Sequence, residues 1–253
     1  MSGEFPDKNY DIIFTIGRMN PPTTGHIGLI NKMKEMARMN GLKDIFIILS
    51  HSHDNSKNPL SCNTKREFLK IMNESTMSDI NVHLLCMDDD IFKQYSSNKV
   101  IAPVLYLVNS YNPGKMLMII GEDRGNAYGW IKNILENPEN PKPVGLDFQV
   151  LERPETAMSA TLIRNLVRDN KLDDFVELQM KTGLSRDKVI ELFTNIQMSF
   201  LKPDPRPKSR KRKAKAPPET NQKRGGRKTY RKKLKTRRKR KTKKSKNSKN
   251  SKK

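Results

Sequence analysis

The chain has 253 residues, a formal net charge of +23 and two cysteines. This length is enough to bury a full hydrophobic core in one large or two small domains. No apolar run approaches the roughly 20 residues that span a bilayer, and the N-terminus lacks a signal-peptide core. Cys62 and Cys86 show neither a pairing pattern nor a metal-ligand spacing, which favours a reducing compartment. We therefore expect a soluble intracellular protein, in cytoplasm or nucleus, with no membrane partner.

The positive charge is concentrated at the C-terminus. Residues 202–253 hold 27 Lys and Arg against two acidic residues, a net charge of +25, so residues 1–201 carry −2. This tail has no hydrophobic periodicity, and we expect it to be disordered and to bind nucleic acid without sequence preference. Its clusters at 208–213 and 237–241 also resemble nuclear-import segments. Similar tails occur on proteins of large DNA viruses, which is a similarity of style and would place the chain in a host cell or virion.

Apolar runs and helical periodicity alternate through the first two thirds of the chain. After a flexible N-terminus (1–9), Ile- and Phe-rich runs predict buried strands at 10–16, 44–50, 80–87, 115–120 and 146–151. Periodic segments predict intervening helices, and the strand-helix-strand order implies right-handed crossovers. The predicted fold class is α/β, a Rossmann-like open parallel sheet of about five strands with helices on both faces. This domain covers 10–170; helices at 172–181 and 185–198 form a small cap (171–201) before the tail (202–253).

The segment Thr15-Ile-Gly-Arg-Met-Asn-Pro-Pro-Thr-Thr-Gly-His26 links the first strand to the first helix. Gly17 ends the strand, the two prolines enforce an extended turn, and Gly25 removes a side chain where a close approach is needed. His26 lies in the first helical turn, where unpaired N–H groups and the helix dipole favour an anion. The segment therefore predicts a phosphate-binding turn, with Arg18 and His26 as further donors.

Polar clusters follow two other predicted strands. The sequence 51–54 (His-Ser-His-Asp) invites a metal assignment, but zinc needs three or four ligands and no His-rich partner segment exists, so we favour a polar loop lining a pocket. Lys65 and Arg66 open the next helix, where a phosphate contact and a solvated helix face explain them about equally well. The three aspartates 88–90 favour a turn with a helix N-cap over a Mg²⁺ site.

A second helix start lies near the end of the sheet. Ser159 is a good N-cap, and Thr161 and Arg164 place a hydroxyl and a guanidinium on the first turns. Considered alone, this is a capped helix with an exposed arginine.

Together, these segments resemble the two signatures of a nucleotidyltransferase superfamily. The pattern Gly-Arg-x-x-Pro-x-x-x-Gly-His, ending in Thr23-Thr-Gly-His26, resembles the (His/Thr)-x-Gly-His motif, and 158–164 resembles Ile-Ser-x-Thr-x-Ile-Arg. The resemblance covers about residues 10–170 and implies a cytidylyltransferase-like fold. In style it is closest to nicotinamide mononucleotide adenylyltransferases.

The resemblance also implies an activity: Mg²⁺-dependent transfer of a nucleotidyl group, AMP from ATP in the first instance, to a phosphorylated small molecule such as nicotinamide mononucleotide, with release of pyrophosphate. It assigns the α-phosphate to His26 and Thr23. The β- and γ-phosphates fall to Arg18, Ser159, Thr161 and Arg164, and close approach of the nucleotide falls to Gly17, Gly25 and Gly121. Asp123 faces the ribose or the acceptor, and Trp130 and His51 are assigned to the acceptor. Trp130 is equally well explained as a helix residue that covers the core. Two alternatives stay open: a cytidylyltransferase acting on a phosphorylated alcohol, and a nucleic-acid-binding or packaging protein with an idle α/β domain.

Truncation after Leu201 separates the tail from the predicted catalytic domain. The truncated chain should lose nucleic-acid binding and keep nucleotidyl transfer, because the removed segment carries the net charge of +25 and has one aromatic residue with which to stack on bases. Binding of the full chain to unrelated DNA duplexes, measured over a salt series, should weaken steeply as salt rises. Sequence-selective binding, or loss of transfer on truncation, would contradict this division.

Overall fold

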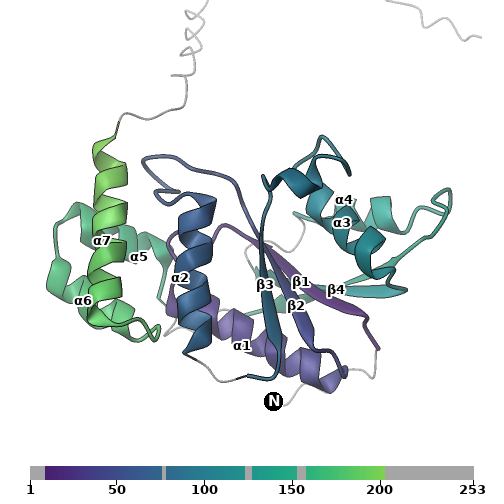
Figure 1. Ribbon diagram of the computed structural model, residues 1–253, viewed down its shortest axis with the longest axis horizontal. Helices are drawn as coiled ribbons and strands as arrows, with labels where there is room; N and C mark the ends of the chain where they lie inside the picture. Colours follow the sequence, from purple (N-terminus) through teal and green to yellow (C-terminus); the bar gives the residue numbers. More distant parts are fainter. Residues whose placement is uncertain (1–8, 76–77, 123–126, 153–157, 203–253) are drawn as a thin grey trace, which may run out of the picture. The chain divides into compact units, whose positions relative to one another are not determined.

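The computed structural model describes residues 9–75, 78–122, 127–152 and 158–202, and its centre is a parallel β-sheet (Figure 1). The five strands are β1 (Ile12–Gly17), β2 (Asp44–Leu49), β3 (Asn81–Cys86), β4 (Lys115–Gly121) and β5 (Gly145–Leu151). All neighbours pair in parallel, in the order β3-β2-β1-β4-β5. The predicted Rossmann-like open sheet is confirmed.

The strand order reverses at β1. From β1 the chain moves outward through β2 to β3, then crosses back to β4 on the other side of β1 and continues to β5. In open α/β sheets, ligands bind outside the carboxyl ends of the strands at such a switch point. The turn that leaves the carboxyl end of β1 therefore lies where the topology favours a ligand.

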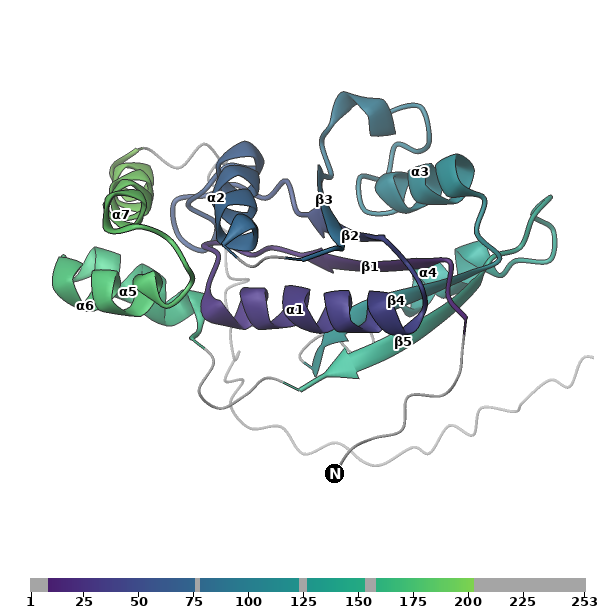
Figure 2. The ribbon, with the colours of Figure 1, turned by 60° about the horizontal axis from the view of Figure 1, so that its bottom comes forward.

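Helices cover both faces of the sheet (Figure 2). Buried residues of α1 and α2 pack with one face of the strands, while buried residues of α3 and α4 pack with the other. The helices are α1 (Thr24–Met39), α2 (Cys62–Glu74), α3 (Ala102–Tyr111), α4 (Gly129–Leu135), α5 (Ala160–Arg168), α6 (Leu172–Met180) and α7 (Arg186–Leu201), with a short 3₁₀ turn η1 (Asp90–Phe92). No helix in the described ranges is long and apolar enough to cross a membrane.

Helix α1 ends at a glycine in a left-handed conformation. Gly41 follows the helix with a φ of 68°, a left-handed conformation in which a side chain would be strained. Its N–H donates to the carbonyl of Arg38, and that of Leu42 to the carbonyl of Ala37 (2.9 Å), so these terminal carbonyls are satisfied. The helix therefore stops before β2.

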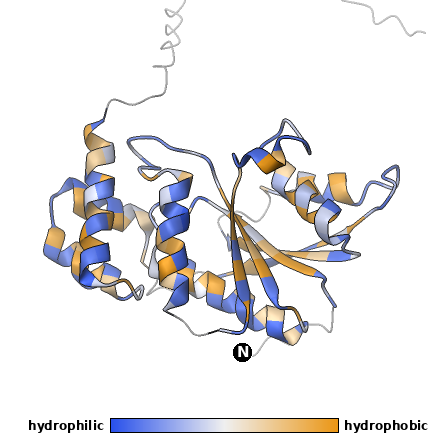
Figure 3. Ribbon diagram, viewed as in Figure 1, coloured by the Kyte–Doolittle hydropathy of each residue, from blue (hydrophilic) through white to orange (hydrophobic). Residues whose placement is uncertain are grey.

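A third hydrophobic cluster lies beside the sheet. It joins apolar residues of α2, including Phe68 and Met72, to α5, α6 and α7. The hydropathy colouring shows apolar strands and helices with an apolar and a polar side (Figure 3). Two of these helices, α6 and α7, correspond to the predicted cap; the domain boundary at 170 stays a prediction, and α5 packs with both cap helices.

The structure pairs the two cysteines, which their spacing in the sequence did not indicate. Cys62 is the first residue of α2 and Cys86 the last residue of β3, and the two form a disulfide with a Cα–Cα distance of 6.0 Å. They lie 24 positions apart, but the parallel pairing of β2 and β3 brings the end of β3 to the start of α2. The expectation that the two cysteines do not pair is therefore wrong, and the compartment stays a prediction.

The disulfide should stabilise the fold measurably. A loop of this length is expected to contribute about 3 kcal/mol through the entropy of the unfolded chain. Dithiothreitol should therefore lower the urea midpoint of the wild type and leave the double variant Cys62→Ala/Cys86→Ala unchanged. An equal response of both proteins to the reductant would show that the bond does not contribute.

Candidate functional site

The candidate site lies at the carboxyl ends of β1 and β4. Gly17 ends β1 and Gly121 ends β4. The two strands are neighbours and pair in parallel up to Thr15 and Ile119, two residues before these glycines. The hydroxyl of Tyr128, just before α4, donates to the carbonyl of Ile16 (3.4 Å). Glycines at the ends of two neighbouring strands allow a ligand to approach the backbone closely.

The turn after β1 is buried and is held through its carbonyl groups. Residues 19–23 are all buried. The carbonyl of Arg18 accepts from Lys65 Nζ (3.1 Å), that of Asn20 from Arg164 Nη1 (2.7 Å) and that of Pro22 from Gln179 Nε2 (3.2 Å). These donors belong to α2, α5 and α6. Three helices therefore fix the path of the turn.

A side chain of the turn adds a further anchor. Asn20 is buried, donates from Nδ2 to the carbonyl of Leu60 (2.8 Å) and accepts from the N–H of Leu60 (3.0 Å). Because both groups of the amide are used, the turn is tied to the segment that leads into α2. Three carbonyls and one side-chain amide of this turn thus have hydrogen-bond partners without regular secondary structure.

His26 is oriented by the residue that begins α1. Thr23 is the N-cap, and its N–H donates to Nδ1 of His26 (3.1 Å). The Thr23 hydroxyl, which is fully buried, lies 2.9 Å from the same nitrogen. Since Nδ1 accepts a hydrogen bond from the N–H of Thr23, the neutral ring carries its proton on Nε2. His26 therefore offers an N–H donor at the positive end of the helix.

The second predicted motif lies beside the turn. Ser159 caps α5, with its hydroxyl accepting from the N–H of Leu162 (3.0 Å), and Thr161 Oγ1 accepts from Arg164 Nη2 (2.9 Å). The bond from Arg164 to the carbonyl of Asn20 joins the two motifs directly. The N-cap prediction is confirmed, and the structure brings Arg164 to the turn after β1.

The site gathers positive charge. The pKa of Arg164 is lowered, first by burial and then by the nearby cations Arg168 and Arg18, although Asp54 acts in the opposite direction. Positive charges that disfavour one another in the free protein are relieved when an anion binds among them. This part of the surface therefore favours a polyanionic ligand.

The polar loop after β2 folds around the carboxylate of Asp54, and Arg168 of α5 donates to its Ser56 carbonyl. Asp54 is buried, and its Oδ1 accepts from the N–H groups of Ser56 (2.9 Å) and Lys57 (2.7 Å) while Oδ2 accepts from Asn58. These bonds hold the pKa of Asp54 well below its usual range despite burial. The carboxylate of Asp54 is thus bound within the loop, and the choice of a polar loop over a metal site stays a prediction.

His51 is exposed at the start of this loop, and His53 Nε2 lies 3.2 Å from the carbonyl of Pro59. The position of His51 at the carboxyl end of β2 is compatible with its predicted role at the acceptor. That role stays a prediction.

Lys65 contradicts one of its two predicted roles. Its side chain is fully buried, so the solvated helix face is wrong, and its ammonium donates to the carbonyls of Arg18 (3.1 Å) and Ser50 (2.6 Å). The phosphate contact stays a prediction. Burial lowers the pKa of Lys65 to about 8, against the opposing charge of Asp88. Arg66, by contrast, pairs with Asp89 (3.1 Å). The sequence does not indicate that Lys65 binds these carbonyls, because a lysine on an amphipathic helix normally faces solvent.

The predicted acceptor residues are placed only in part. Trp130 lies on α4 with 36% of its surface exposed, whereas its neighbour Ile131 is fully buried in the core. The indole is therefore not a core residue, and its contact with an acceptor stays a prediction. Asp123 lies outside the described residues.

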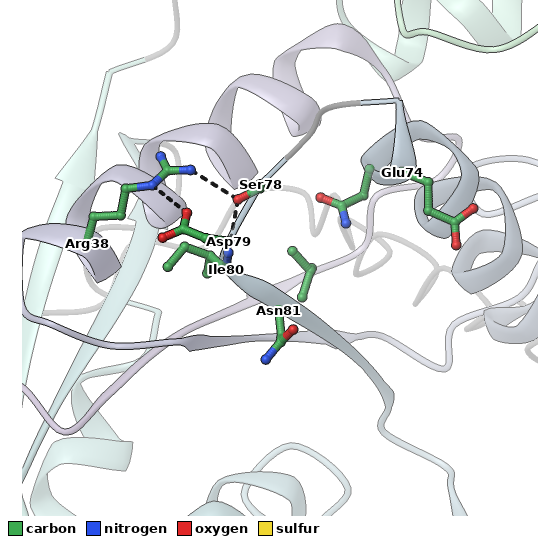
Figure 4. A pocket seen from close by; sticks show the side chains of 8 residues that line it. Arg38, Glu74, Ser78, Asp79, Ile80 and Asn81 are labelled. Atoms are coloured by element: carbon green, nitrogen blue, oxygen red, sulfur yellow. Dashed lines mark hydrogen bonds and ion pairs between the residues drawn. The ribbon is translucent and has the colours of Figure 1, made fainter.

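A surface hollow lies away from this site, at the amino end of β3 (Figure 4). There Arg38 donates to Asp79 (2.9 Å) and to the hydroxyl of Ser78 (3.1 Å), which also accepts from the N–H of Ile80. Because Arg38 and Asp79 pair with each other here, at the opposite end of the strands from the turn after β1, we do not assign a ligand to this hollow.

Comparisons with known proteins gave weak similarities. No protein-family model and no curated protein sequence matches the chain. A solved bifunctional NMN adenylyltransferase/ADP ribose pyrophosphatase from Francisella tularensis is 16% identical, with a TM-score of 0.45 over 64% of this chain and 43% of that chain. Its complex with AMP and a manganese ion is 17% identical, with a TM-score of 0.44 over 63% of this chain and 42% of that chain.

A third solved structure is matched over most of its own length. The nicotinic acid mononucleotide adenylyltransferase of Plasmodium falciparum, complexed with NaAD, is 12% identical, with a TM-score of 0.46 over 73% of this chain and 96% of that chain. This chain spans less than half of the Francisella chains. At such identities and TM-scores the similarity carries no information about activity, which has to be argued from the residues of the site.

The lowered pKa of Lys65 predicts an unusual pH dependence of stability. Between about pH 8 and pH 10.5 this lysine is neutral in the folded protein and charged in the unfolded chain. The unfolded state then binds more protons, so this group adds stability as pH rises, by about 2 to 3 kcal/mol at pH 10. The difference in unfolding free energy between wild type and Lys65→Met, measured in urea at pH 7 and pH 10, should grow by this amount. A constant difference would contradict it.

Proposed function

We propose that this chain is a nucleotidyltransferase that moves AMP from ATP to a phosphorylated small molecule, such as nicotinamide mononucleotide, and releases pyrophosphate. The observation that carries the proposal is the bond from Arg164 to the carbonyl of Asn20. It joins two helix starts, those of α1 and α5, at the switch point of the sheet. Each helix start offers N–H groups and a positive dipole end, which together suit a chain of phosphates.

The reaction needs no covalent intermediate. An oxygen of the acceptor phosphate forms a bond to the α-phosphorus, the bond from that phosphorus to the α,β-bridging oxygen breaks, and pyrophosphate leaves with the electron pair. Catalysis then consists of positioning and of stabilising the negative charge that develops. The protein contributes prearranged donors to both.

The donors divide along the triphosphate. The Nε2–H of His26 would bind the α-phosphate, with Thr23 orienting the ring from behind; a direct contact of Thr23 with the phosphate is not needed. Arg18, Arg164, Thr161 and Ser159 would hold the β- and γ-phosphates, and Gly17, Gly25 and Gly121 would allow close approach of the nucleotide. Each of these assignments is part of the proposal.

Magnesium is part of the proposal as a companion of the substrate. Mg²⁺ usually binds substrate phosphates with one or two carboxylates and several waters. In the described ranges, the one group of three possible metal ligands is Cys62, Cys86 and Asp88, and its two sulfurs form the disulfide. In this proposal the ion arrives with the triphosphate, where it would neutralise phosphate charge.

The identity of the nucleotide base and of the acceptor is the part of the proposal that the residues of the site constrain least. A cytidylyltransferase would use the same turn, and a thermal-shift comparison of ATP with CTP, each with Mg²⁺, separates the two. A protein that acts only through its basic tail would show no shift with either. The tail is proposed to bind nucleic acid in addition, as its charge predicts.

Replacing His26 should remove a donor to the α-phosphate. We expect His26→Ala to lower turnover by roughly 10²- to 10³-fold, as for the loss of one prearranged oxyanion donor. Pyrophosphate release from ATP in the presence of nicotinamide mononucleotide measures it. The control is His83→Ala, because His83 lies on β3, where it contacts Asp44, at the opposite end of the sheet. Unchanged turnover in His26→Ala would remove the assigned role.

Replacing Arg164 should affect the triphosphate more than the acceptor. We expect Arg164→Ala to raise KM for ATP by on the order of tenfold or more, because guanidinium contacts to phosphate are charge-assisted. Arg38→Ala is a matched control, since Arg38 pairs with Asp79 at the other edge of the sheet. If KM rose equally for both substrates, a folding defect would explain the variant better.

A further inference from the structure

Lys65 is a buried cation that binds the backbone of the turn after β1 directly. Its ammonium donates to the carbonyl of Arg18 in the turn and to that of Ser50 at the end of β2. The N–H of Ser50 in turn donates to the carbonyl of Gly17 (2.9 Å). One side chain thus ties together the segments that leave β1 and β2.

The charge of Lys65 is not neutralised by contact. The ammonium forms no ion pair with a carboxylate in the described part of the chain, and Asp88 acts on it through space alone. A buried cation bound only to carbonyls is costly in a protein interior. The hydroxyl of Ser50 beside it is buried and has no hydrogen-bond partner among the described residues. An anion bound nearby would offset this free-energy cost, because its charge is opposite to that of the ammonium.

We propose that Lys65 is a positioning residue of the triphosphate site, an inference that rests on the proposed function. By binding the carbonyl of Arg18 it turns that carbonyl away from the ligand and fixes the backbone that carries the Arg18 side chain. Its ammonium also adds positive charge beneath the turn. Lys65 touches no substrate in this proposal; it acts through the turn.

The chain offers a matched control. Lys34 is also a buried lysine, 2% exposed on α1, and its pKa is also lowered by burial and then by Arg38. Lys34 lies in the second half of α1, away from the turn after β1 that precedes this helix. Replacement of either lysine removes a buried cation, but only Lys65 holds the turn.

The experiment compares Lys65→Met, Lys65→Gln and Lys34→Met in the full chain with Mg²⁺. Met removes both the charge and the donors, whereas Gln keeps N–H donors for the two carbonyls and removes the charge. We measure KM for ATP, KM for the acceptor and kcat, together with ATP and pyrophosphate affinities by calorimetry. Urea unfolding gives the stability of each variant.

We expect Lys65→Met to raise KM for ATP and to weaken pyrophosphate binding by on the order of tenfold, with KM for the acceptor unchanged. Lys65→Gln should lie between Lys65→Met and the wild type, and it decides the question if Lys65→Met does not fold. Lys34→Met should bind ATP as the wild type does. Equal changes in KM for ATP in the Lys65 and Lys34 variants, or unchanged ATP binding in the folded Lys65 variants, would overturn the inference. Neither result would affect the proposed function, which depends on the activity of the wild type. A wild type that neither binds nor cleaves a triphosphate would instead refute the proposed function.

Discussion

The candidate site depends on the need of a buried backbone turn for hydrogen-bond partners. Residues 19–23 connect β1 to α1 inside the protein, where an unpaired carbonyl would cost free energy. The turn contains two prolines and forms no regular ladder, so its carbonyls must be satisfied by side chains. Lys65, Arg164 and Gln179 fulfil this need. A turn satisfied in this way is rigid before any ligand arrives, as a prearranged anion site requires.

Much of this arrangement could be predicted because its determinants are local. Ile- and Phe-rich runs specify buried strands, Ser159 marks a helix start, and Gly41 marks a helix end. The positions of Gly17 and Gly121 at strand ends then follow from parallel pairing. Each of these features depends on a few neighbouring residues and on the chemistry of their backbone.

Other features depend on contacts between distant residues, which periodicity does not reveal. The pairing of Cys62 with Cys86 needs the register of β2 and β3, and the burial of Lys65 needs α2 to lie across the ends of β1 and β2. The side chain of Gln179 reaches the turn over 157 positions of sequence. An isolated polar residue on an amphipathic helix carries no sign of such a partner.

The helices that supply the three donors share one hydrophobic cluster. Apolar residues of α2, α5 and α6 pack together with α7, and a packed cluster of this kind tends to open and close as a cooperative unit. Opening it would release all three carbonyls of the turn together. Occupation of the turn by a phosphate chain would then slow hydrogen exchange in α6 and α7, although neither helix start belongs to the proposed phosphate site. The cap and the turn would therefore behave as one thermodynamic element, linked by mass action to the ligand.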